Sequence, residues 1–261
     1  MWWFGRCEPS FKGVGVFELA VVFAIVLLGA FLQRVSGMGL ALLSAPILSL
    51  LMGPVVGVLV VNLLAFFNAA IASVTVRAWI DWKKFSLIAS VLVVGAVPGA
   101  YLVGLASPAV LQVLVGSLLL VALVLVIYGQ RWIPPIGGPS AAVASGIAAG
   151  FMNTTAGVAG PAVTVYAVAS AWEQRSFAAT LQPIFMVAGL ISLVAKLVLG
   201  AGTISDTNVW VWPVGILGML LGNWLGLRLA DRIPRSRART LSLWVAAAGG
   251  ASALGRGLMT L

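Results

Sequence analysis

The 261-residue sequence contains no histidine, one cysteine (Cys7) and only six acidic residues. Zinc sites are built mainly from Cys, His and carboxylates, and catalytic nucleophiles usually need a neighbouring base, so the sequence offers little for either. One thiol also excludes a disulfide within the chain, and no P-loop motif is present. These absences argue against an enzyme or an ATP-driven pump, and we predict neither a cofactor nor a metal ion.

Charged residues are scarce throughout the chain. Asp, Glu, Lys and Arg make up 8% of it, whereas 62% is hydrophobic, and the mean hydropathy is +1.14. Such a composition predicts a polytopic membrane protein in contact with the lipid bilayer, not a soluble domain. The net charge of +9 does not indicate nucleic-acid binding, because the basic residues lie in short loops between apolar runs, which is the positive-inside pattern.

The apolar runs divide the sequence into two halves of similar plan. They lie at residues 14–32, 40–52, 55–76, 85–105 and 109–128, and then at 141–152, 161–172, 177–199, 209–229 and 241–254. A Pro/Gly-rich linker at residues 130–139 separates the halves. A shift of 123 residues lays Gly37 on Gly160, Gly95 on Gly218 and Gly99 on Gly222. We therefore predict an N-terminal transmembrane repeat (residues 1–133) and a C-terminal one (residues 134–261) within one membrane domain.

The basic loops predict the orientation. Residues 77–84 and 228–239 are rich in Lys and Arg and are predicted to be cytoplasmic, whereas residues 106–108 and 201–208 carry no basic residue and are predicted to face outward. The 123-residue shift lays loops of opposite kind on each other, which predicts inverted halves. The expected fold is all-α, with two inverted-topology repeats, each a Gly-broken helical hairpin plus three spanning helices. Whether the hairpin segments cross the membrane fully or re-enter stays open.

Each half contains a polar, Gly-rich break where a membrane helix would be continuous, at residues 33–39 and 153–160. Irregular backbone at membrane depth is costly unless it is buried in protein or lines a cavity, and paired breaks are typical of transporter binding sites. A helix starting after such a break has free N–H groups that can bind an anion. The residues predicted to form this site are Ser36, Gly37, Met38, Gly39, Asn153, Thr154, Thr155, Gly157 and Gly160. In the alternative, the glycines only permit close helix packing.

The sequence resembles the sulfite exporter TauE/SafE family of membrane permeases. The resemblance rests on the break Gly37-Met38-Gly39 followed by Pro46, on the second break ending in Gly160-Pro161, and on the Gly-x-x-Pro-Gly pattern at residues 95–99. It covers about residues 15–255. It implies transport of small sulfur-containing anions, such as sulfite or organosulfonates, across the inner membrane of bacteria or archaea.

The resemblance predicts an exporter, but two alternatives remain. An importer of the same anions would have the same sequence features, and a membrane scaffold would not transport at all. A scaffold does not need inverted halves with polar breaks at matching depth, so the breaks favour transport. The family often has glycines where this sequence has Met38 and Leu40, and Arg34 lies in the first break, so the substrate stays open.

Arg34 and three amides are the remaining candidates for binding the anion. A guanidinium near the tip of a hairpin could form a bidentate pair with a sulfonate or sulfite, whereas in a fully spanning segment Arg34 would snorkel to the interface. Asn62, Asn68 and Gln182 lie in apolar segments, where amides either join helices or line a path. Lys196, near the end of its segment, is expected to snorkel, and the Gly-xxx-Gly patterns at 95–99 and 218–226 are expected to serve packing.

Overall fold

The structure is a computed structural model that describes residues 15–132, 136–202, 207–229 and 232–261. Within these ranges the regular structure is helical, with no strand. The boundary predicted between residues 133 and 134, and also Cys7, lie outside them. The first half forms α1 (Val16–Ser36), α2 (Leu40–Met52), α3 (Pro54–Val76), the 3-10 turn η1 (Arg77–Trp79), α4 (Trp82–Ala89), α5 (Leu92–Leu105) and α6 (Pro108–Trp132). The second half forms α7 (Pro139–Ala156), α8 (Gly160–Ala169), α9 (Gln174–Val198), α10 (Val211–Leu229) and α11 (Arg235–Thr260).

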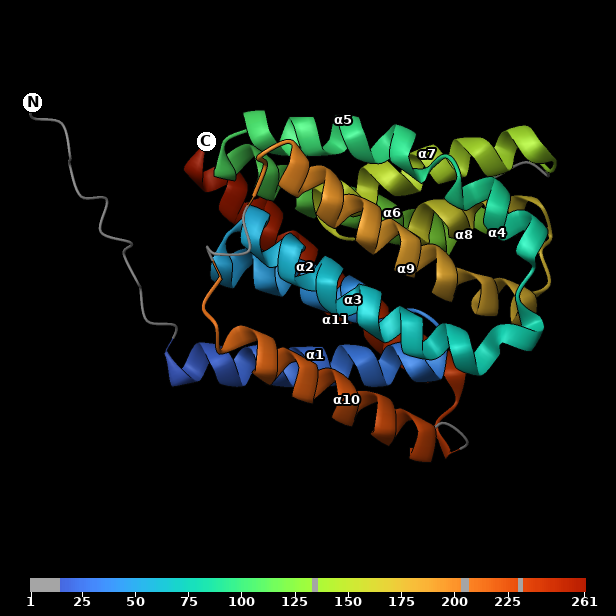
Figure 1. The fold of residues 1–261 in the computed structure, drawn as a ribbon, viewed down its shortest axis with the longest axis horizontal. Helices are drawn as coiled ribbons and strands as arrows, with labels where there is room; N and C mark the ends of the chain where they lie inside the picture. Colours follow the sequence, from blue (N-terminus) through green and yellow to red (C-terminus); the bar gives the residue numbers. More distant parts are fainter. Residues whose placement is uncertain (1–14, 133–135, 203–206, 230–231) are drawn as a thin grey trace, which may run out of the picture.

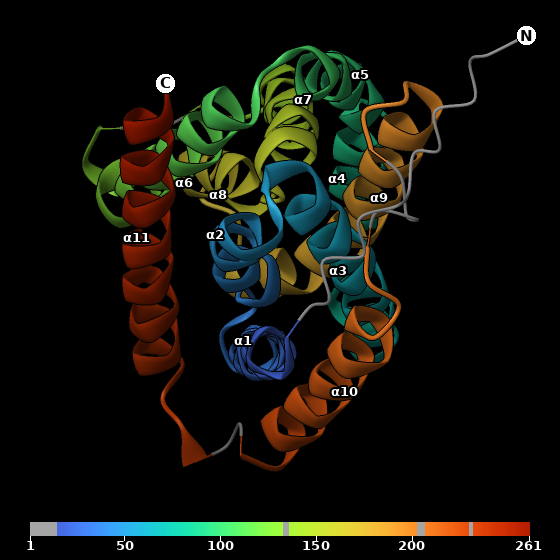
Figure 2. The same cartoon turned by 90° about the vertical axis from the view of Figure 1, so that its left-hand side faces the viewer.

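Helices from the two halves pack against each other in pairs (Figures 1 and 2). In these pairs α1 lies along α10, α7 lies along α5, α3 crosses α9, and α6 lies along α11. Each half thus places its first helix on a later helix of the other half. Buried side chains of both halves share the two larger hydrophobic clusters, one that includes Val26 and Val158 and one that includes Leu92 and Ile184.

The close helix crossings are made by glycine. A Cβ atom at Gly95 or Gly150 would collide with backbone atoms of Ile147 or Leu92, across the contact of α5 with α7. Gly218 and Gly222 similarly meet the backbone of α1. Without a side chain, the two backbones can approach within van der Waals contact. The prediction that the Gly-xxx-Gly patterns serve packing is confirmed.

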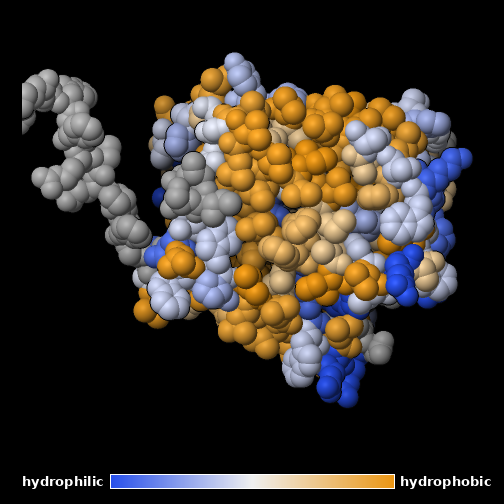
Figure 3. Space-filling view, viewed as in Figure 1, coloured by the Kyte–Doolittle hydropathy of each residue, from blue (hydrophilic) through white to orange (hydrophobic). Residues whose placement is uncertain are grey.

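Apolar side chains cover much of the outer surface. Figure 3 shows them across the middle of one face, with hydrophilic residues mainly toward its edges, and exposed Leu, Val, Ile, Trp and Phe side chains are numerous. Five stretches are helical, long and apolar enough to cross a membrane: Val16–Ser36, Pro54–Trp79, Trp82–Leu105, Pro108–Leu125 and Gln174–Val198. Two shorter apolar helices, Leu40–Met52 and Gly160–Ala169, match the short segments predicted at 40–52 and 161–172.

The second helix break is shorter than the sequence suggests. Segment 141–152 was expected to end before Asn153, but α7 continues to Ala156. The Thr154 and Thr155 hydroxyl groups donate to the carbonyl groups of Gly150 and Phe151, one turn earlier, so their polar groups are satisfied inside a helix. Segment 85–105 also differs, since a turn at residues 90–91 divides it into α4 and α5.

In Figure 1 the helices begin and end at two opposite ends of the bundle. The start of α1, the end of α5, the end of α9 and the end of α11 lie at one end. The 3-10 turn η1, the start of α9 and the end of α10 lie at the other. The helix ends that border the two basic loops therefore share one end of the molecule, and those that border the two links without a basic residue lie at the opposite end.

Candidate functional site

Both helix breaks are built around a glycine in the left-handed conformation. Gly37 ends α1 with φ of 89°, and its N–H donates to the Gln33 carbonyl oxygen over 2.8 Å. Gly157 ends α7 with φ of 75°, and its N–H donates to the Asn153 carbonyl oxygen over 2.9 Å. Glycine is the residue that most readily adopts this conformation at the end of a helix. The next helices begin at Leu40 and Gly160.

At the breaks, the two halves correspond with a shift of 120 residues and not of 123. The 123-residue shift pairs Gly37 with Gly160, but the two left-handed glycines that end the helices are Gly37 and Gly157, which are 120 residues apart. The 123-residue shift still holds for Gly95 and Gly218, which both pack on the first helix of a half. From Phe23, which Gly218 meets, α1 runs 14 residues to Gly37 (37 − 23), whereas from Ile147, which Gly95 meets, α7 runs 10 residues to Gly157 (157 − 147). The helix that ends at the first break is therefore longer beyond its packing contact.

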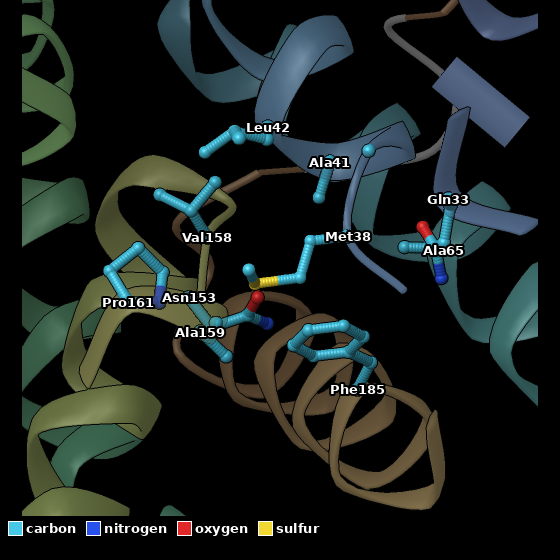
Figure 4. Close-up of a pocket in the computed structure, with 12 residues that line it drawn as sticks. Gln33, Met38, Ala41, Leu42, Ala65, Asn153, Val158, Ala159, Pro161 and Phe185 are labelled. Carbon is cyan, nitrogen blue, oxygen red and sulfur yellow. The ribbon is translucent and has the colours of Figure 1, made fainter. Parts of the chain in front are cut away.

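A small cavity lies between the two breaks, and we call it the break cavity (Figure 4). Its volume is about 30 Å³, and its walls are mainly apolar. It is lined by Gln33, Met38, Gly39, Ala41, Leu42, Ala65, Asn153, Val158, Ala159, Gly160, Pro161 and Phe185. By this measure, in which one water needs about 10–15 Å³, the cavity has room for about two water molecules. The breaks therefore meet in the core around a small, mainly apolar space.

Two pairs of buried amides join the breaks to the central helices. Gln33 Nε2 donates to Gln182 Oε1 over 3.1 Å, and Asn153 Nδ2 donates to Asn62 Oδ1 over 3.2 Å. The 120-residue shift lays Gln33 on Asn153 and Asn62 on Gln182. Each pair thus joins the broken helix of one half to the central helix, α3 or α9, of the other half. Of the two roles left open for Asn62 and Gln182, these contacts show that both residues join helices. Lining the path of the anion stays a prediction for both.

The same amides also bond to the irregular backbone at the first break. The Leu40 N–H donates to Gln33 Oε1 over 3.1 Å, and Gln182 Nε2 donates to the Gly37 carbonyl oxygen over 3.1 Å. The Ser36 hydroxyl group lies 2.8 Å from the carbonyl oxygen of Met38, to which it donates. These bonds satisfy polar backbone groups that the helix break would leave unpaired in the core.

A larger cavity of about 510 Å³ opens beside the first break, and we call it the vestibule. Its lining includes three arginines, Arg34, Arg175 and Arg239, and no acidic residue among the residues that the structure describes. The full lining is Gln33, Arg34, Val35, Ser36, Gly37, Asn68, Ala72, Thr75, Val76, Trp79, Gln174, Arg175, Ala178, Ala179, Gln182, Asn223, Ser236 and Arg239. Positive charge in a low-dielectric recess raises the local concentration of anions.

The vestibule narrows from an exposed rim to a buried polar floor. At the rim the Arg175 guanidinium lies 3.2 Å from the centre of the Trp79 ring, and Trp79 is 47% exposed. At the floor Asn68 is buried and accepts a hydrogen bond from Asn223 Nδ2. Within the described part of the chain, the Nδ2 atom of Asn68 itself has no hydrogen-bond partner. Gln33 lines both the vestibule and the break cavity. The Gln33–Gln182 pair therefore stands between the two spaces.

The predicted site residues do not all lie together. Arg34 lies in the vestibule wall and not between the breaks, and its Nη1 atom donates to Thr75 Oγ1 over 2.7 Å. Met38, Gly39, Asn153 and Gly160 line the break cavity, whereas Thr154, Thr155, Gly157 and Asn62 line neither space. Binding of an anion by these residues stays a prediction.

Sequence reasoning did not name Gln33, Arg175, Asn223 or Arg239 as site residues, although all four line these two spaces. Gln33 and Asn223 are buried amides in apolar segments, the same signal that identified Asn62 and Asn68. Arg239 was assigned only to orientation and Arg175 was not considered, because the sequence does not show that the first turns of α9 and α11 meet at one cavity.

Helices long and apolar enough to span a membrane, two breaks that meet in the core and a basic cavity beside them define a multi-pass membrane protein of the transporter class. A family model for sulfite exporter TauE/SafE matches residues 22–253. The chain belongs to this family, whose members are membrane transporters of sulfite or similar anions and not enzymes. Comparison with curated proteins and with solved structures finds no match to the chain.

Proposed function

We propose that the chain is a secondary permease that exports small sulfur-containing anions, such as sulfite or organosulfonates, across a bacterial or archaeal inner membrane. The observation that carries this proposal is the vestibule, where three arginines surround a path that ends at the Gln33–Gln182 pair beside the first break. Arginine suits oxyanions because its planar guanidinium can donate two parallel hydrogen bonds. The unpaired Nδ2 of Asn68 supplies a further donor at the floor.

In this mechanism the anion collects in the vestibule and crosses at the breaks. The Gln33–Gln182 pair separates before the anion enters, and the backbone N–H groups near Gly39 and Gly160 then bind it. The break cavity, at about 30 Å³, is far smaller than the vestibule, at about 510 Å³, and the Gln33–Gln182 pair stands between them. This arrangement fits a conformation that is open at the vestibule and narrower beyond it. The residues that we propose to bind the anion remain those predicted from the sequence, together with Gln33. Of these, Thr154, Thr155, Gly157 and Asn62 line neither cavity in this conformation, so they would contact the anion only after the breaks open.

We also propose that the halves are inverted repeats and that the vestibule faces the cytoplasm. The contacts between helices support the first point. In the repeat, α1 corresponds to α7 and α5 corresponds to α10, so the contact of α1 with α10 and the contact of α7 with α5 are equivalent. The basic loops at residues 77–84 and 228–239 support the second, because the positive-inside pattern predicts them to be cytoplasmic and they share the vestibule's end of the bundle. A vestibule on the cytoplasmic side suits export.

The test is a thermal-shift panel on the detergent-solubilised protein with sulfite, sulfate, thiosulfate, taurine and sulfoacetate, against sodium chloride at equal ionic strength. A bound anion should raise Tm by mass action, with about 2.7 kcal/mol of stabilisation at a hundredfold excess over Kd. Proteoliposomes loaded with the unlabelled stabilising anion should then take up the labelled form of that anion from outside. A chain that shows neither a shift nor exchange with any of the five is not a permease for this class, and the scaffold alternative would replace it.

A further inference from the structure

One face of α9 carries polar or small residues along most of its length. Gln182, Gly189, Ser192 and Lys196 recur at spacings of seven, three and four residues, which places them on one side of a helix. Gln182 bonds to Gln33, Gly189 packs against the Asn62 backbone, and Ser192 Oγ accepts a 2.7 Å hydrogen bond from Asn62 Nδ2. The face therefore leads from the vestibule past both amide pairs.

Lys196, the last residue of this face, is buried. It is 1% exposed, and its Nζ atom has no hydrogen-bond partner among the residues that the structure describes. The sequence-based prediction that Lys196 snorkels to the interface is wrong, because its side chain lies on the buried face of α9, whereas Leu197 and Val198 beside it are exposed. Removing an ammonium group from water costs several kcal/mol unless it is paired, and ionisable residues kept inside membrane bundles usually serve function.

No acidic residue lies on the helices packed against α9. Helices α3 and α7 carry no charged residue, α5 has only Tyr101 as a titratable group, and α8 has only Tyr166. Lys83, Lys84 and Arg77, on α4 and η1, lie by the start of α9. Lys196 is 14 residues beyond Gln182, about 21 Å along the helix at 1.5 Å per residue. The protein thus provides no counter-ion at this end of α9 within its described residues.

We propose that Lys196 is an anion-binding residue on the part of the path that lies beyond the breaks, and that it binds the same sulfur oxyanion as the vestibule. This inference rests on the proposed function. The ammonium group offers three donors to an oxyanion, and the arriving anion supplies the missing counter-charge. Because Lys196 is enclosed in this conformation, the anion reaches it when the Asn62–Asn153 pair and the Ser192 bond open.

A purely structural role for Lys196 makes a different prediction. If the residue only fills space, an apolar side chain of similar length should do so as well or better, because the desolvated charge is lost. Lys196→Met should then keep or raise Tm and leave transport unchanged. If Lys196 binds the anion, the same variant should fold but transport poorly. Methionine therefore separates the two roles.

The experiment measures sulfite counterflow in proteoliposomes for the parent, Lys196→Met, Lys196→Arg and the matched control Lys83→Met, an exposed lysine outside both cavities. We expect Lys196→Met to lose counterflow about tenfold or more, corresponding to about 1.4 kcal/mol, Lys196→Arg to retain part of it, and Lys83→Met to match the parent. Sulfite should still raise the Tm of Lys196→Met, since the vestibule is intact. If Lys196→Met does not fold, Lys196→Gln replaces it in the same comparison.

The outcomes separate this inference from the proposed function. Counterflow of Lys196→Met equal to that of an active parent overturns the role of Lys196 alone. A parent that neither binds nor carries sulfite or the other anions of the panel overturns the proposed function, and the inference about Lys196 falls with it.

Discussion

Arg34 lies at the last turn of α1, where its surroundings leave a guanidinium facing the vestibule. Its stem passes over Gly226, where a Cβ atom would come within 2.6 Å of the Arg34 Cβ. Its Nη1 atom is held by Thr75. One hydrogen bond to a hydroxyl group leaves the other donors of the guanidinium available to an oxyanion. The structure thus favours neither of the two positions expected for Arg34, the break or the interface.

We predict that Arg34→Ala weakens sulfite binding about tenfold, because a charge-assisted pair with an oxyanion is worth roughly 1.5–3 kcal/mol. Arg34→Lys should recover only part of the affinity, since a point charge does not reproduce two parallel bonds. The measurement is a titration of Tm against sulfite concentration. Arg256→Ala is the matched control, because Arg256 donates to the Leu50 carbonyl group away from both cavities. Equal affinity of Arg34→Ala and the parent would assign Arg34 to packing alone.

Buried amides are the second feature at the scale of single residues. Gln33 satisfies the Leu40 N–H and Gln182 at once, and Asn62 links Asn153 to Ser192. These bonds are made by side chains that can also bond to an anion after a rotamer change. The amide pairs can therefore both hold the closed conformation and line an open path.

At the scale of elements, the first break depends on the close return of the chain over α1. A Cβ atom at Gly39 would lie 2.5 Å from the Gln33 backbone nitrogen and 2.7 Å from the Gly29 carbonyl oxygen. Both are backbone atoms, which cannot move without distorting the helix. The first break is therefore constrained at two residues. Gly37 adopts the left-handed backbone conformation, and Gly39 has no room for a side chain.

We predict that Gly39→Ala destabilises the protein by about 1–3 kcal/mol, the usual cost of overpacking a well-packed site. Thermal unfolding in detergent, followed by circular dichroism, measures the effect. Gly255→Ala is the control, since Gly255 lies within α11 with open space around it. It should keep or raise Tm, because alanine favours a helix over glycine by about 0.5–1 kcal/mol. A Tm for Gly39→Ala as high as that of Gly255→Ala would show that the break adjusts freely.

At the scale of the whole molecule, the proposed inversion predicts which side of the membrane each loop faces. Ser107 is exposed at the link between α5 and α6, and Ser236 is exposed near the start of α11, at the vestibule. In Figure 1 the two links lie at opposite ends of the bundle. Single cysteines at these positions can report their sides once the only native cysteine, Cys7, is replaced by serine.

We expect Ser107→Cys to react with a membrane-impermeant thiol reagent in intact cells, and Ser236→Cys to react only after permeabilisation. The physical reason is the retention of basic loops on the cytoplasmic side. The extent of labelling is read by gel shift, and the Cys7→Ser parent gives the background. Reaction of both cysteines from the same side in intact cells would contradict the inverted arrangement, and the reverse pattern would place the vestibule outside.

The sequence by itself determined the class of the protein, the short and long apolar segments and the approximate place of the two breaks, of which the second is shorter than predicted. These follow from local chemistry. A chain with only 8% charged residues has the composition of a membrane protein. Gly37 and Gly157 end helices because glycine tolerates the left-handed conformation. The family resemblance, which the family match over residues 22–253 confirms, also depended on these local patterns.

The tertiary structure alone decided which side chains meet. Gln33 and Gln182 are 149 residues apart and Asn62 and Asn153 are 91 apart, so their pairing depends on how the two halves pack against each other. Packing also gathered Arg34, Arg175 and Arg239 from three helices around one vestibule. It buried Lys196, which its sequence position near a helix end had suggested would reach water. Burial and contact depend on every neighbouring helix, whereas hydropathy and helix ends depend on a few successive residues.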